Sequence, residues 1–167
     1  MLVVFSGLPG TGKTAIAREL ARQIGAVYLR IDSIEQAIKD SGLAPQSLND
    51  MGYRCAYAVA EDNLRLGRSV IADCVNPMTI SRDAWLSVAH RADSRILEIE
   101  IKCSDLNEHR RRVENRDIDI SGLRRPTWDD VMTREYELWN REHMTIDTAK
   151  TSITESVAVI RRSIVKT

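Results

Sequence analysis

The chain carries a glycine-rich segment near its N-terminus, Gly7-Leu8-Pro9-Gly10-Thr11-Gly12-Lys13-Thr14, which constrains the fold more than any other feature. The segment fits the pattern G-x-x-x-x-G-K-[ST], in which a loop joins a strand to a helix. The apolar run of residues 2–6 before it is typical of a strand buried in a parallel sheet. After it, apolar residues recur at helical spacing until Gly25: Ile16, Ala17, Leu20, Ala21 and Ile24. This context predicts a strand–loop–helix unit of an α/β fold.

The chemistry of this loop indicates phosphate binding. Its glycines allow backbone N–H groups to converge on phosphate oxygens, and the helix that follows directs its positive end at the same anion. Lys13 would add a positive charge at the β- and γ-phosphates, and the Thr14 hydroxyl would reach Mg2+. The alternative is a glycine turn before a helix that binds no ligand. We expect all eight residues to hold the phosphates of ATP or GTP together with Mg2+.

The rest of the chain alternates between strand and helix patterns. Further strands are expected at residues 27–31, 69–72, 95–101 and 144–146. Further helices are expected at residues 33–39, with Ser33 as the cap, and at 49–66, 78–91, 105–116, 127–140 and 152–164. Such alternation predicts an α/β protein: a three-layer α/β/α sandwich with a five-stranded parallel sheet. We expect one domain over residues 1–167, because no linker or repeat divides the sequence.

Composition and charge narrow the classes of function. Lys plus Arg and Asp plus Glu both number 24, so the net charge is zero, whereas general nucleic-acid binders usually carry a basic excess. No stretch approaches the ~18 apolar residues that a membrane span needs, and the N-terminus lacks the basic region of a secretion signal. The three cysteines make no disulfide or metal pattern: Cys55, Cys74 and Cys103. We therefore expect a cytoplasmic protein that does not act on membranes; these features say nothing of its oligomeric state.

Four segments in this order resemble the small P-loop kinases: G-L-P-G-T-G-K-T-A-I-A-R-E-L-A, R-I-D-S, S-V-I-A-D-C-V-N-P and R-R-V-E-N-R. That group includes gluconate, shikimate and adenylylsulfate kinases, chloramphenicol phosphotransferase, zeta-type toxins and polynucleotide 5′-kinases. Its relatives are often described only as AAA-type ATPases or kinase-like proteins. The resemblance covers nearly the whole chain. It implies a nucleotide-kinase-like P-loop fold and an enzyme that moves the γ-phosphate of ATP, with Mg2+, to a hydroxyl of a small-molecule acceptor.

Two aspartates follow predicted strands, at the sheet edge where parallel α/β proteins bind ligands. The resemblance implies that Asp32 hydrogen-bonds the acceptor hydroxyl and takes its proton, and that Asp73 orients Mg2+ through water. The two roles could be exchanged. Asp32 could also cap a helix, and Asp73 a loop. Arg54 and Asn76 lie where related kinases place acceptor-binding groups, although ordinary surface or helix-start roles fit them equally well.

The segment Arg112-Val113-Glu114-Asn115-Arg116 is similar to the R-[LV]-x-x-R sequence that opens the lid in these kinases. Its two arginines lie one helical turn apart. The similarity implies that Arg112 contacts the phosphates and Arg116 the lid or the adenine side, with interchangeable roles; a solvated charged helix is the alternative. Residues 117–126 contain little apolar sequence, so we expect them to form a mobile and poorly contacted lid.

Other functions are compatible with the same phosphate loop. An AAA-type ATPase acting as a nucleotide-dependent switch is one, although no Asp-Glu pair ends a strand as a hydrolytic Walker B sequence usually does. A kinase of nucleic-acid 5′ ends is disfavoured by the zero net charge and by the few exposed-looking aromatic residues. A toxin that phosphorylates a sugar nucleotide also stays open.

Overall fold

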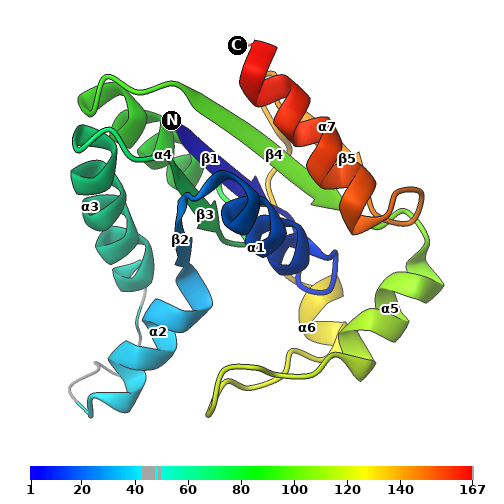
Figure 1. Ribbon diagram of the computed structural model, residues 1–167. Coiled ribbons are helices and arrows are strands. Elements are labelled where there is room, and N and C mark those ends of the chain that lie inside the picture. The colour runs from blue at the N-terminus through cyan, green and yellow to red at the C-terminus, as the bar shows by residue number, and fades with distance from the viewer. Residues whose placement is uncertain (43–47, 49, 167) are drawn as a thin grey trace.

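The computed structural model describes residues 1–42, 48 and 50–166 of the chain. Within them the strands are β1 (Leu2–Ser6), β2 (Val27–Arg30), β3 (Val70–Asp73), β4 (Ile96–Lys102) and β5 (Met144–Asp147). They form one sheet in the order β2-β3-β1-β4-β5, and every pairing is parallel (Figure 1). The predicted five-stranded parallel sheet is confirmed.

Helices cover both faces of the sheet and complete the expected three layers. They are α1 (Lys13–Ile24), α2 (Ile31–Asp40), α3 (Met51–Arg65), α4 (Thr79–Arg91), α5 (Leu106–Asn115), α6 (Trp128–Met132) and α7 (Ile153–Lys166). One apolar cluster lies between the sheet and α1 and α7, and a second lies between the sheet and α3 and α4. Figure 1 shows α2 and α5 beyond the end of the sheet toward which the strands point. No helix among the described residues has the length and apolar character to cross a membrane.

The central strand, β1, explains where the glycine loop lies. All five of its residues are buried, because Leu2 and Val4 face the α3–α4 cluster while Val3 and Phe5 face the α1–α7 cluster. A strand covered on both faces reads as a continuous apolar run. β3 lies on one side of β1 in the sheet and β4 lies on the other. The loop after β1 therefore lies at the topological switch point, where open α/β sheets bind ligands.

The second helix begins earlier than predicted. α2 starts at Ile31, directly after β2, with Arg30 as the N-cap residue. Ser33 is therefore not the cap, and Asp32 lies within the first helical turn. The reason is tertiary, because Ile31 is buried in the α3–α4 cluster and fixes the first turn against the sheet. The predicted start of the next helix at Asn49 lies outside the described residues, and α3 begins at Met51.

The predicted helix over residues 127–140 is wrong beyond its first turns. Thr127 and Asp130 form a capping box, as their spacing predicts. However, α6 ends at Met132, and residues 133–143 form neither helix nor strand. Local helical spacing is a weak signal that tertiary contacts can override.

The tertiary contact that overrides it is made by Arg82 of α4. This side chain is fully buried and donates hydrogen bonds to the backbone oxygens of Glu137 (2.9 Å) and Leu138 (3.3 Å). Its guanidinium carbon also lies 4.3 Å from the ring centroid of Trp139. A buried guanidinium needs acceptors, and the free carbonyls of an irregular segment supply them readily. The segment therefore stays irregular.

We predict that Arg82→Ala lowers the free energy of unfolding by about 3 kcal/mol or more, since it removes a fully buried side chain and leaves the carbonyls of Asn76, Pro77, Glu137 and Leu138 without this donor. Urea denaturation followed by circular dichroism measures this loss. Arg91→Ala is the matched control: Arg91 is about half exposed and pairs with Glu61 on the surface, so it should cost at most about 1 kcal/mol. Equal losses for the two variants would contradict the role of Arg82.

Candidate functional site

The glycine loop between β1 and α1 has a backbone that only glycine fits well. Gly7, Gly10 and Gly12 have φ of 132°, 82° and 96°. A Cβ atom on Gly7 would lie 2.2 Å from the backbone oxygen of Ile101, and one on Gly10 would lie 2.5 Å from a methyl group of Val113. Because each approach is closer than real Cβ contacts, the loop can pass between β4 and α5 only with glycine at these positions.

Hydrogen bonds fix the shape of this loop. The Thr11 hydroxyl donates to the Leu8 oxygen (2.9 Å), and the His109 ring donates through Nε2 to the Pro9 oxygen (2.8 Å). The Thr148 hydroxyl donates to the Thr11 oxygen (2.8 Å). α1 follows with Gly12 as its N-cap and no side-chain cap, so its first amides remain for an anion. The loop is shaped for phosphate.

Lys13 lies at the bottom of the loop. It is buried, with 7% of its surface exposed, and its Nζ donates to the Leu8 oxygen at 2.8 Å. Burial lowers the pKa of Lys13, and the carboxylates of Asp73 and Asp32 act against this shift. A phosphate at the loop would likewise favour the charged ammonium.

Asp73 ends β3 beside the loop and has a fixed orientation. It is buried, and the Tyr28 hydroxyl donates to its Oδ2 at 2.6 Å. Thr14 lines the same cavity. A hydroxyl and one carboxylate fit Mg2+, which usually takes one or two protein oxygens together with substrate phosphates. Among the described residues no three His, Cys, Asp or Glu side chains form a cage that would hold a metal by themselves.

α2 brings two carboxylates to the site, and sequence reasoning identified only one. Asp32 and Glu35 lie one turn apart and both line the cavity. Glu35 packs against α3 where Gly52 has no side chain: a Cβ there would lie 2.4 Å from Glu35 Cγ. Burial, and secondly the charge of Asp32, raise the pKa of Glu35. The i, i+3 spacing from Asp32 was the available signal, but the depth of the pocket was not readable from sequence.

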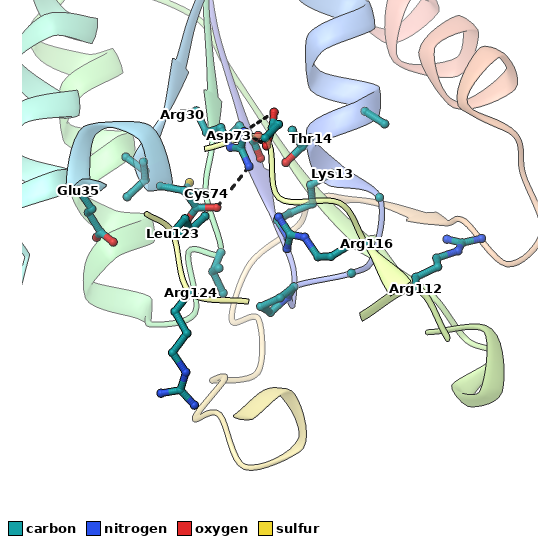
Figure 2. A pocket seen from close by; sticks show the side chains of 18 of the residues that line it. Lys13, Thr14, Arg30, Glu35, Asp73, Cys74, Arg112, Arg116, Leu123 and Arg124 are labelled. Atoms are coloured by element: carbon teal, nitrogen blue, oxygen red, sulfur yellow. Dashed lines mark hydrogen bonds and ion pairs between the residues drawn. The ribbon is translucent and has the colours of Figure 1, made fainter. Parts of the chain in front are cut away.

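These groups share one cavity of about 880 Å³, which we call the large cavity. Its wall combines the phosphate loop and α1 with the ends of β2 and β3, α2, and residues of the 111–124 region. Figure 2 shows Lys13, Thr14 and Asp73 close together, with Glu35 on the opposite wall. The prediction that Asp32 and Asp73 both face the phosphate loop across one cleft agrees with this placement.

The two predicted lid arginines point to different places. Arg112 is held by Glu108 (Nε to Oε1, 2.7 Å) and donates to the Thr148 hydroxyl (2.8 Å). Arg116 is not on the predicted helix, because α5 ends at Asn115 and Arg116 is extended. In Figure 2 its side chain lies beside Lys13 while Arg112 points away. Among the described residues Arg116 has no hydrogen-bonded or ion-paired partner.

A second cavity of about 280 Å³, the small cavity, lies on the other side of the loop. Its lining consists of Gly12, Ala15, Ile16, Arg112, Thr148, Thr151, Ser152 and Ile153. Arg112 also lines the large cavity, whereas Arg116 lines the large cavity alone. The large cavity is bounded by β2, at one edge of the sheet, and the small cavity by the loop after β5, at the other edge. The phosphate loop therefore separates two sites.

Two predicted acceptor-binding residues are not brought to either cavity. Arg54 is exposed on α3 and pairs with Asp50 at 2.7 Å. Asn76 is fully buried behind the site, where its side chain donates to the Ser6 hydroxyl (2.9 Å) and accepts from Ser81 (2.8 Å). These contacts give Asn76 a structural role in the loop after β3.

Residues 117–126 form part of the wall of the large cavity, and most of them are exposed, but charged side chains fasten the segment. Asp119 binds Arg30 through Nη1 (2.9 and 3.0 Å) and also pairs with Arg18. Arg125 donates to the Glu114 oxygen at 2.9 Å. The segment is therefore fastened to the core by charged side chains rather than by apolar packing.

With this geometry in view, comparisons with known proteins identify the family. The sequence profile of the AAA domain family matches residues 2–135, most of the chain. The chain belongs to the AAA domain family. A comparison of this AAA-domain chain with curated proteins found no match.

Solved structures resemble this AAA-domain chain over nearly its whole length. The APS kinase CysC of Mycobacterium tuberculosis, in complex with AMPPNP and APS, has a TM-score of 0.73 at 19% identity, covering 98% of this chain and 96% of that one. A sugar kinase from Janibacter sp. HTCC2649 has 0.70 at 15%, covering 98% and 93%. Chaetomium thermophilum Kti12, in complex with ADP-AlF3, has 0.71 at 19%, covering 98% and 99%. At these identities the likeness shows the fold, which is that of the P-loop kinases, and the predicted resemblance is confirmed.

We predict that Lys13→Ala in this AAA-domain chain weakens MgATP binding about 10- to 100-fold, the equivalent of one charge-assisted hydrogen bond. Isothermal titration calorimetry measures the change. Arg65→Ala, which also removes one positive charge but from an exposed surface pair with Glu61, is the control and should change the affinity less than about twofold. Unchanged ATP binding in Lys13→Ala would contradict the phosphate loop assignment.

Proposed function

We propose that this protein is an ATP-dependent phosphotransferase that moves the γ-phosphate to a hydroxyl of a small-molecule acceptor. The observation that carries the proposal is the pair of cavities on either side of the phosphate loop. A nucleotide whose base lies in the small cavity would direct its γ-phosphate toward the large cavity. There the second substrate would meet the carboxylates of α2. A protein that only hydrolyses ATP needs room for water, not for a second substrate.

The nucleotide would be held mainly by backbone groups. The amides of the loop and of the first turn of α1 would bind the phosphates, and Lys13 would place its charge at the β- and γ-phosphates. Arg112, fixed by Glu108 and Thr148, would line the base. Two solved relatives of the same fold hold AMPPNP and ADP-AlF3, which supports a nucleotide at this place.

Thr14 and Asp73 would hold Mg2+, which supplies charge neutralisation at the phosphates when bound. Asp73 would act through water, and its orientation depends on Tyr28, whose hydroxyl occupies one carboxylate oxygen. Burial, followed by the charge of Asp73, raises the pKa of Tyr28, so Tyr28 stays a hydrogen-bond donor at neutral pH.

The proton of the acceptor hydroxyl would pass to Asp32. This carboxylate lies on α2 at the wall of the large cavity, and Arg30 Nη2 lies 3.8 Å from its Oδ2. A carboxylate on the wall of the cavity is the kind of group that can accept the proton of a hydroxyl. Glu35, whose pKa is raised by burial, would position the acceptor one turn further along the helix.

We predict that Asp32→Asn lowers kcat about 10²- to 10⁴-fold while MgATP affinity changes less than about threefold, because a base acts mainly in the transition state. A coupled assay for ADP release, with an acceptor found by screening small hydroxyl compounds for phosphate transfer, together with calorimetry, separates the two effects. Asp50→Asn, at the exposed residue that precedes α3, is the control and should behave as wild type. Equal losses of affinity and turnover would argue against Asp32 as the base.

A second pair of variants tests the arginines. Arg116 faces Lys13 and would stabilise charge on the transferred phosphoryl group, so Arg116→Ala should lower kcat about 100-fold with little change in nucleotide affinity. Arg112→Ala should do the opposite, weakening nucleotide binding more than turnover. Arg110→Ala is the control, because Arg110 is exposed and pairs with Glu114. If Arg112→Ala lowers kcat more than Arg116→Ala does, the roles are exchanged.

Transfer itself is tested with γ-labelled ATP and Mg2+ against pooled small metabolites and against nucleic-acid 5′ ends. We expect label in a small hydroxyl compound. Water as the only acceptor at a useful rate would support a nucleotide-dependent switch instead, and labelled nucleic-acid ends would support an end kinase.

A further inference from the structure

Arg30, the last residue of β2, is a buried charge whose hydrogen bonds are largely unmade. Its side chain is only 3% exposed. A guanidinium carries about five N–H donors. Among the described residues only Nη1 of Arg30 has a hydrogen-bond acceptor, the carboxylate of Asp119. Nε and Nη2 are buried without any hydrogen bond. Asp32 lies 3.8 Å from Nη2, which is too long for a hydrogen bond.

A structural role does not account for this arrangement. An arginine that served only to anchor residues 117–126 would be expected to use its other donors too, because leaving them buried and unpaired costs free energy. The other buried donors without partners among the described residues, on Trp85, Tyr136 and Trp139, are neutral groups that do not line the large cavity. Arg30 is charged and does line it.

Asp119 shows which kind of group fits beside Arg30. Its carboxylate lies between Arg30, from β2, and Arg18, from α1. Two guanidinium groups around one carboxylate form an anion site, since the planar fork matches carboxylate and phosphate oxygens. The Asp119 side chain is 41% exposed and belongs to a segment without helix or strand. It can therefore be replaced by another anion without disturbing the core.

Protonation cannot release Asp119 near neutral pH. Desolvation acts to raise its pKa, but the hydrogen bonds from Arg18 and Arg30 outweigh it and hold the pKa of Asp119 at about 2. The carboxylate thus remains charged, and a competing anion is the way to displace it.

We propose that Arg30, with Arg18, binds an anionic group of the acceptor, a phosphate or a carboxylate, and that Asp119 occupies this subsite when no acceptor is bound. The acceptor would then be a hydroxyl compound that also carries a negative charge. Binding it would free Asp119 and rearrange residues 117–126 over the large cavity. The inference rests on the proposed function in one respect, namely that the bound anion belongs to a phosphate acceptor.

The first test uses labelled inorganic phosphate and equilibrium dialysis, on protein saturated with Mg2+ and AMPPNP so that the γ-phosphate position is filled. Asp119→Asn removes the competing carboxylate and should tighten phosphate binding about tenfold or more. Asp117→Asn is the matched control: it removes the same charge two residues away, from a residue that lines the cavity but does not bind Arg30. It should change phosphate affinity less than about twofold.

Arg30→Gln combined with Asp119→Asn should abolish saturable phosphate binding. The Arg30 substitution is buried and can destabilise the fold, so the single variant Asp119→Asn serves as an independent test. If phosphate affinity does not increase in this exposed variant, the proposal is overturned. Equal tightening by Asp117→Asn would overturn it as well. Loss of phosphate binding on addition of AMPPNP would assign the subsite to the γ-phosphate and overturn it.

The second test compares acceptor pairs that differ in one anionic group, such as a sugar and its phosphate or an alcohol and the matching hydroxy acid. The anionic member should have a kcat/KM at least about tenfold higher, and Arg30→Gln should remove that advantage. Equal kcat/KM for both members overturns this inference and leaves the proposed function standing. If no compound accepts phosphate, the proposed function fails. The role of Arg30 is then still tested by phosphate binding to the Lys13→Ala variant in the absence of nucleotide.

Discussion

The close approach of the phosphate loop to the backbone of β4 is the constraint on which the site depends. Gly7 lies so near the Ile101 oxygen that a single added carbon would collide with it, and Gly10 meets α5 in the same way. The loop is thus held between the sheet and a helix more than ninety residues away, with Thr148 as a third support. Its amides are oriented before any anion arrives, so binding requires little further ordering.

Charge is balanced in this site by groups from separate elements. Lys13 comes from α1, Arg30 from β2, Asp32 from α2 and Asp73 from β3. Lys13, Arg30 and Asp73 are buried and lose hydration, whereas Asp32 stays partly exposed. Opposite charges from other elements act against the cost of burial, as the effects of the two aspartates on the pKa of Lys13 illustrate. Such a site responds strongly to an incoming anion or cation, because in a low-dielectric cavity one added charge alters all the others.

Arg82 connects the outer part of the molecule to this site. Besides the carbonyls of residues 137 and 138, it donates to the Asn76 and Pro77 oxygens, in the loop that follows Asp73. Glu137 returns a contact by accepting from the Thr79 amide at the start of α4. One buried guanidinium therefore joins the loop after β3 to the irregular segment of residues 137 and 138. The hydrogen bonds that Arg82 makes offset the cost of burying its charge.

The sequence alone determined the fold class and the phosphate loop, because apolar periodicity and glycine requirements are local properties of the chain. It also predicted that Asp32 and Asp73 would share one cleft, since parallel strands end at the same edge. It could not predict that Glu35 lines the large cavity or that Arg54 and Asn76 do not. It also could not predict that Arg112 borders the small cavity while Arg116 lies beside Lys13. These depend on which side chains meet after α2, α3 and α5 pack, and on where a helix stops. The same holds for Arg30, which looks like an ordinary strand residue in the sequence. Only tertiary packing decides which charged side chains lose their hydration, because burial depends on elements that are distant in the chain.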